Sequence, residues 1–165
     1  MVEPDVAAYE DLYNRRKRHA FLYARSILGA ERAEDACQEA WLRAWRSWGA
    51  ADARKLDAWL LRIVRNCSID SLRSNRRTEE LDEADLPPIE DFDESVVAAL
   101  DASQVGQMLE VLSAPLREVL WLREVMDLSY ADIAALQEVP VGTVMSRLHS
   151  ARTRAARILR EQGAW

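Results

Sequence analysis

The sequence predicts an all-helical protein in which two small domains, an N-terminal helical bundle and a C-terminal helix-turn-helix, are joined by an acidic linker. Alanine, leucine and arginine are abundant in the 165 residues, whereas glycine and proline occur only five times each. Apolar residues recur at helical spacing in two separate blocks, and a segment between the blocks lacks this spacing. Pro87-Pro88 lies in that segment and forbids a continuous helix across it.

Three helices are expected in the first domain, residues 1–78. They cover about 5–28, 31–48 and 56–76. The second has the most regular apolar spacing, formed by Ala33, Ala36, Cys37, Ala40, Trp41, Ala44, Trp45 and Trp48. We interpret the three tryptophans of this face first as core residues. The three apolar faces together predict a small bundle.

The second domain, residues 95–165, is expected to end in three helices with clear start signals. Ser113-Ala114-Pro115 places a proline in the first turn of one helix. Ser129-Tyr130-Ala131-Asp132 resembles a capping box and opens a short second helix. Pro140 begins a longer third helix that runs to about Leu159. A short helix, a tight turn and a longer helix are typical of a helix-turn-helix.

Charge separates these domains from the segment between them. Residues 1–78 contain 15 Lys/Arg and 11 Asp/Glu, whereas residues 79–114 contain 11 Asp/Glu and no Lys/Arg. Residues 115–165 contain seven Lys/Arg and six Asp/Glu. The net charge of −6 therefore describes none of the three parts. Residues 79–94 are expected to form a flexible, solvated linker.

Several classes of protein are disfavoured by what the sequence lacks. No stretch approaches the roughly 20 apolar residues of a membrane span, and the acidic N-terminus does not resemble a signal peptide. Cys37 and Cys67 fall on apolar helix faces, where a free buried thiol is the default, and His19 and His149 are far apart in sequence. We therefore expect a cytoplasmic protein without metal, cofactor, membrane contact or small-molecule substrate, and not an enzyme.

The last predicted helix carries a polar and basic face that is suited to nucleic acid. The helix that starts at Pro140 has short, polar or basic side chains in its N-terminal half, where base edges and phosphates would lie: Thr143, Ser146, Arg147, His149 and Arg152. An amphipathic helix with a solvated arginine face remains an alternative. Gly142 favours the first interpretation, because it would let the backbone approach a phosphate.

Motifs along the chain resemble those of the extracytoplasmic-function (ECF) sigma factors of bacterial RNA polymerase. The run AEDACQEAWLRAW at residues 33–45 is similar to the second region of that family. LLRIVRN at residues 60–66, followed by Asp70 and Arg73, is similar to the next part of the same domain. SYADIA at 129–134 and VPVGTV at 139–144 resemble the helix-turn-helix of its fourth region. The motifs occur in the family's order over nearly the whole chain.

The resemblance implies that the protein binds core RNA polymerase and has no catalytic site. It implies that one helix face docks on the coiled coil of the largest polymerase subunit, and this face is formed by Asp35, Gln38, Glu39 and Leu42. The earlier helices of the second domain would pack on the polymerase flap. Many members are held by an anti-sigma factor, which is therefore an expected partner.

The resemblance also implies promoter contacts that help to melt the DNA. The loop at residues 49–55 would receive a base flipped from the −10 element. The third helix would hold the −10 strand through Trp59, Arg62, Arg65, Asn66, Arg73 and Arg76. For Trp59, a partly buried core position is the alternative to stacking on a base. The −35 element would be read by Thr143, Ser146, Arg147, His149 and Arg152.

Three positions depart from the family pattern. Glu138 stands where glycine is usual in the turn, and a positive φ there would cost on the order of 1 kcal/mol. Met145 and Ser150 stand where cations are common, which predicts fewer phosphate contacts and a weaker dependence of DNA binding on salt. The acidic linker has two open interpretations: a solubilising tether, or a mimic of nucleic acid in the basic path that nascent RNA later uses.

The main alternative function is a conventional helix-turn-helix regulator that binds duplex DNA without core polymerase. Such a regulator would not need the face at Asp35, Gln38 and Glu39. A helical metalloenzyme could use Asp35 and Glu39 as ligands but lacks partner carboxylates. An adaptor that only titrates another protein would not need the arginines of the third helix. Each alternative explains one block of the sequence and leaves another unexplained.

Overall fold

The computed structural model describes residues 5–75 and 111–163. Every regular element in these two stretches is helical, which confirms the predicted all-α class. The chain divides into two compact units, one on each side of Glu79-Glu80. The expected linker at 79–94 lies outside the described residues. So does most of residues 96–112, where apolar residues again recur at helical spacing.

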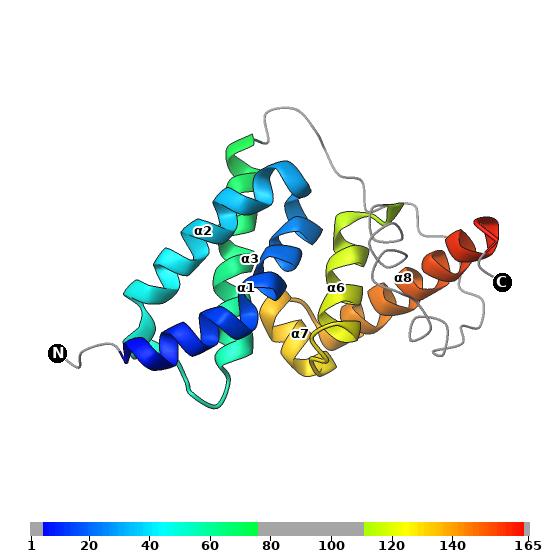
Figure 1. Cartoon of the computed structure of the whole chain (residues 1–165). Helices are drawn as coiled ribbons and strands as arrows, with labels where there is room; N and C mark the ends of the chain where they lie inside the picture. Colours follow the sequence, from blue (N-terminus) through cyan, green and yellow to red (C-terminus); the bar gives the residue numbers. More distant parts are fainter. Residues whose placement is uncertain (1–4, 76–110, 164–165) are drawn as a thin grey trace. The chain divides into compact units, whose positions relative to one another are not determined.

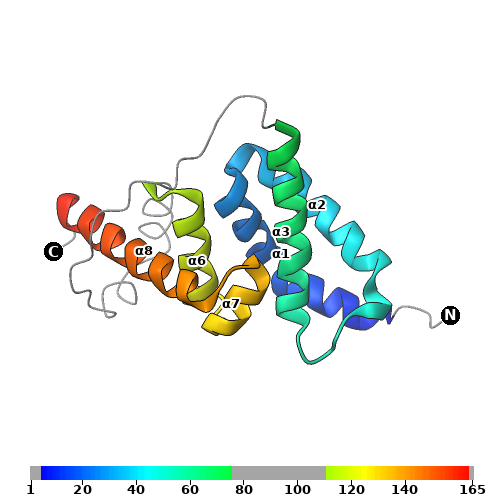
Figure 2. The same ribbon diagram turned by 180° about the vertical axis from the view of Figure 1, so that it is seen from behind.

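The N-terminal unit is a bundle of three helices, with α1 at Val6–Leu28, α2 at Ala30–Arg46 and α3 at Leu56–Asn75. Each helix packs against the other two (Figure 1). Figure 2 shows the same bundle from behind, with α3 running past α1. Its core combines large side chains with the alanines of α2, which let the neighbouring helices approach closely: Leu12, Ala20, Tyr23, Ala33, Ala40, Ala44, Leu60, Leu61 and Val64.

The junction between α1 and α2 is a single glycine. Gly29 has φ +82°, a conformation that side chains disfavour, and its N–H donates to Arg25 O at 2.8 Å. At the other end of α1, the Asp5 carboxylate accepts a hydrogen bond from the Ala8 N–H at 3.1 Å. Both bounds of the first helix lie within a residue of the expected ones.

The tryptophans of α2 are less buried than the sequence predicts. Trp41 is 8% exposed and belongs to the core, whereas Trp45 is 37% exposed. Trp48 is half-buried, because α2 ends at Arg46 and a 3-10 turn, η1 at Trp48–Ala50, follows. The expectation of three core tryptophans is therefore right only for Trp41.

The C-terminal unit contains α6 at Ala114–Glu124, α7 at Tyr130–Gln137 and α8 at Val141–Glu161. The Ser129 hydroxyl accepts a hydrogen bond from the Asp132 N–H at 3.1 Å and caps α7, as its sequence predicts. Short helix, turn and long helix form the expected helix-turn-helix. They share a core that includes Leu116, Val119, Leu120, Leu122, Ile133, Leu136, Val144, Leu148, Ala151 and Leu159.

Candidate functional site

One face of α2 is polar and open to solvent. Asp35, Gln38 and Leu42 are exposed and Glu39 is half-buried. Their spacing of three and four residues places them on one side of the helix, opposite the buried alanines. Two carboxylates beside an exposed leucine suit a protein surface that is basic and partly apolar.

Arg43 connects this face to α3. Its Nε donates to Glu39 Oε1 at 2.9 Å and its Nη1 donates to Asp70 Oδ2 at 3.2 Å. All three side chains are substantially exposed, so the network contributes little to stability. Its effect is geometric, because it restrains the Glu39 carboxylate and brings Asp70 beside the α2 face. The sequence alone placed Asp70 only on an outer face of α3.

The outer face of α3 is basic. Arg62, Asn66 and Arg73 are exposed, while Trp59 and Arg65 are half-buried. Trp59, Arg62, Asn66 and Arg73 share a helical face by their spacing, so the structure brings these predicted residues together. Arg76, the remaining predicted residue of this helix, lies outside the described residues.

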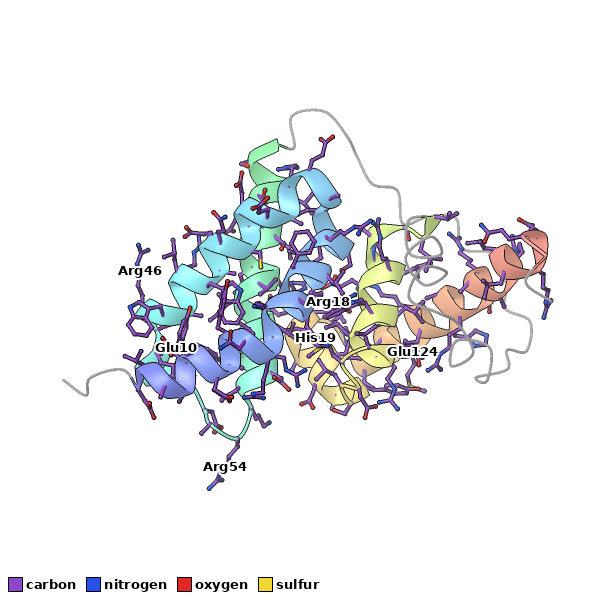
Figure 3. All side chains as sticks on the ribbon, viewed as in Figure 1. Glu10, Arg18, His19, Arg46, Arg54 and Glu124 are labelled. Atoms are coloured by element: carbon purple, nitrogen blue, oxygen red, sulfur yellow. The ribbon has the colours of Figure 1, made fainter. Side chains whose placement is uncertain are left out.

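A short loop between η1 and α3 is held firmly at both ends. The rings of Trp48 and Trp59 meet edge to face, with centroids 5.8 Å apart. Arg16 of α1 forms a bidentate ion pair with Asp57 in the first turn of α3, at 2.8 and 2.7 Å. Between these anchors Arg54 is exposed and extends away from the bundle (Figure 3).

Tyr9 of α1 lies at the centre of an aromatic cluster beside this loop. Its ring packs edge to face on Trp41, Trp45 and Trp48, with centroids 6.0, 4.9 and 5.4 Å away. Its hydroxyl donates to the Trp41 carbonyl at 2.7 Å. Its contacts explain how Trp45 and Trp48 stay ordered while partly exposed.

The two cysteines are buried between helices and unsuited to metal or redox chemistry. Burial raises the pKa of the Cys37 thiol to about 11 and also raises that of Cys67. Both thiols are therefore protonated at neutral pH. Within residues 5–75 and 111–163, no group of three or more His, Cys, Asp or Glu could hold a metal ion. No helix in those ranges is long and apolar enough to cross a bilayer.

The N-terminal half of α8 presents the predicted recognition residues. Ser146 is exposed, while Thr143, Arg147 and His149 are half-buried. No atom lies within 4 Å of the position that a Cβ on Gly142 would occupy, so the start of the helix is open to a ligand. This arrangement suits a phosphate at the helix N-terminus and base edges one turn further on.

Arg152 has a different environment from the other predicted α8 residues. Its Nε and Nη2 both bond Glu124 Oε1 of α6, at 3.1 and 2.7 Å. The two side chains are only 12% and 29% exposed. Arg152 therefore joins α8 to α6, and its predicted contact with DNA stays a prediction.

The turn before α8 carries a conformational cost. Glu138 has φ +56° and ψ +44°, so the departure from glycine noted in the sequence does fall on a left-handed residue. The adjacent Gln137 is buried, and its amide atoms have no hydrogen-bond partner among the described residues. Such a residue pair lowers the stability of the turn by on the order of 1 kcal/mol or more.

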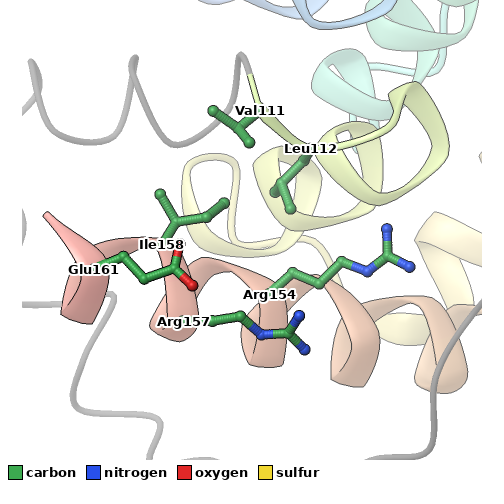
Figure 4. Close-up of a pocket in the computed structure, with 6 residues that line it drawn as sticks. All are labelled: Val111, Leu112, Arg154, Arg157, Ile158 and Glu161. Atoms are coloured by element: carbon green, nitrogen blue, oxygen red, sulfur yellow. The ribbon is translucent and has the colours of Figure 1, made fainter.

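A pocket of about 300 Å³ lies near the C-terminal end of α8. It is lined by apolar and charged side chains that do not converge on one point: Val111, Leu112, Arg154, Arg157, Ile158 and Glu161 (Figure 4). The α8 residues that line the pocket all lie in the C-terminal half of that helix. Thr143, Ser146, Arg147 and His149 lie in its N-terminal half and do not line the pocket.

The described geometry defines a class of protein. One unit combines an exposed acidic face with a basic helix beside an exposed loop, and the other is a helix-turn-helix with a cationic second helix. A protein of this design binds DNA and also docks on another protein.

Comparison with known proteins identifies the family. Residues 12–78 match Sigma-70 region 2, and residues 102–154 match Sigma-70, region 4. ECF RNA polymerase sigma factor SigL of Mycobacterium tuberculosis is 36% identical over 165 residues, covering 96% of this chain and 93% of SigL. For SigW of Bacillus subtilis the identity is 30%, covering 95% and 91%. The structure of sigma factor RpoE from Bartonella quintana, in complex with anti-sigma factor NepR, matches with TM-score 0.72 and 27% identity, over 93% of this chain and 97% of that one.

The chain therefore belongs to the ECF sigma factors of bacterial RNA polymerase. It binds core polymerase, recognises promoter −10 and −35 elements and helps to melt DNA at the start of transcription. Sigma factors, as a family, are not enzymes.

Proposed function

We propose that two domains divide the work of this sigma factor. Residues 1–78 bind core polymerase and the −10 element, residues 95–165 bind the −35 element, and the acidic residues 79–94 connect them. The protein works in the cytoplasm, where polymerase and chromosome are, and has no catalytic activity, metal or cofactor. The single observation that carries this division is the presence of an acidic face and a basic helix within one bundle.

Core binding is assigned to the α2 face. Asp35, Gln38, Glu39 and Leu42 dock on the coiled coil of the largest subunit. Their exposure and common helix side support this role, and so does the mixture of carboxylates with an exposed leucine. Binding to the polymerase flap is assigned to the helices of the second domain that precede α8.

Contact with the melted −10 strand is assigned to the loop and α3. The exposed Arg62, Asn66 and Arg73 hold the strand with Arg65 and Arg76, and the loop at 49–55 receives a flipped base. Trp59 is half-buried and packs edge to face against Trp48, so only part of its ring is open to that base. Stacking can offset the few kcal/mol that flipping costs.

Contact with the −35 element is assigned to Thr143, Ser146, Arg147 and His149 on α8. Arg152 contributes first by holding α8 on α6 through Glu124. An anti-sigma factor is a further partner, supported by the structural match to RpoE, which was solved with its own anti-sigma factor.

The test is core binding and run-off transcription with an Asp35→Asn, Glu39→Gln variant on a promoter library. These changes remove two charges but keep side-chain shape. We expect affinity for core to fall about 5- to 150-fold, with promoter-specific transcripts lost in parallel, because charged contacts at a docking face contribute roughly 1–3 kcal/mol together.

The matched control is Asp11→Asn, which removes an exposed carboxylate that pairs with Arg15 on α1. It should leave core binding unchanged. Unaltered core affinity in the double variant would contradict the assignment of this face. Absence of core binding by the wild type, together with specific binding to duplex DNA alone, would favour a conventional helix-turn-helix regulator.

A further inference from the structure

Two large apolar side chains are exposed on the recognition helix. Val141 is 43% exposed and Met145 is 54% exposed. They lie four residues apart, hence on one side of α8, while Val144 and Leu148 face the core. The packing of α8 against its neighbours therefore does not account for either exposed side chain.

The polar and cationic residues around these two side chains favour nucleic acid as the ligand of this surface. Ser146 and His149 continue the face that Val141 and Met145 begin. Helix α8 carries five arginines, at positions 147, 152, 154, 157 and 160, against the single carboxylate of Glu161, and Glu124 of α6 pairs with Arg152. A cationic helix of this kind complements a polyanion, whereas an apolar protein groove would not require the arginines.

The chemistry of the major groove narrows the ligand further. Among the base edges exposed there, only thymine carries an apolar group, its 5-methyl. Methionine is flexible and polarisable, so it adapts well to such a small apolar contact. We propose that Met145, assisted by Val141, reads the 5-methyl group of thymine in the −35 element. This rests on the proposed role of α8 in −35 binding.

The test uses holoenzyme assembled from core polymerase and the full chain. A −35 element is first selected from a random library, and each thymine in it is then replaced by deoxyuridine, which lacks only the methyl group. We expect one or two replacements to weaken promoter binding by about three- to fivefold, the effect of one buried methyl. Holoenzyme that carries Met145→Ala should bind promoters with thymine and promoters with uracil at those positions equally well.

The matched control is Val6→Ala, which shortens an exposed apolar residue in the first turn of α1 and should keep the preference for thymine. A selected element without thymine would overturn the proposal. So would equal binding of thymine and uracil by the wild type, or an undiminished preference in Met145→Ala. Selection of no −35 sequence at all would overturn both this proposal and the DNA-reading role of α8, which distinguishes the two failures.

Discussion

The basic helices α3 and α8 carry the same residue type in contrasting environments. On α3, Arg62 and Arg73 are exposed to solvent. On α8, Arg152 is 12% exposed and holds the carboxylate of Glu124 from the neighbouring helix. An arginine's place within a DNA-binding motif therefore does not decide whether its guanidinium is available to DNA. The charge of the helix packed against it decides this.

The largest effect is expected on α3. Replacing Arg62 and Arg73 together by alanine should reduce formation of the open promoter complex roughly 100-fold, because a hydrogen bond to a charged group contributes about 1.5 kcal/mol. The thermal unfolding temperature of the protein should not change, since both side chains are exposed. Permanganate reactivity of the −10 thymines with holoenzyme measures the effect.

Arg15→Ala removes an exposed arginine from α1 and is the control for general loss of positive charge. If the double variant forms open complexes as well as the wild type does, α3 is not the strand-binding helix. The contrast between α3 and α8 would then lose its functional meaning.

A smaller effect, on stability, is expected at Arg152. Arg152→Ala should lower the free energy of unfolding of the C-terminal unit by about 1–2 kcal/mol, because it leaves a partly buried Glu124 without its partner. Glu124→Ala should cost a similar amount, and the double variant little more than either single one. Hydrogen–deuterium exchange of α6 and α8 in the full chain would report the loss. Unchanged protection in Arg152→Ala would return this arginine to the DNA-contacting group.

The sequence predicts the helices and their inner faces well, because helical spacing and caps are local signals. Gly29 and Ser129 mark helix ends where expected. Some arginines are held by carboxylates of neighbouring helices, and these ion pairs join residues that are distant in sequence: Arg16 with Asp57, and Arg152 with Glu124. Such pairs depend on how helices pack, which spacing along one helix does not specify. Trp45 illustrates the same limit: it continues the apolar face of α2, yet the Tyr9 ring of α1 covers only part of it and 37% of the residue stays exposed.

The smallest effect concerns salt. Met145→Lys would give the N-terminal half of α8 an added exposed cation and make it more like α3. If the lysine neutralises one phosphate, the slope of log affinity against log salt concentration should steepen by about 0.9. Stability should not change, because the Met145 side chain is largely exposed. Binding of holoenzyme to its promoter over a salt series measures the slope. Val6→Lys adds the same charge on α1 and should leave the slope unchanged. Equal slopes for both variants would mean that a lysine at position 145 does not reach the DNA backbone.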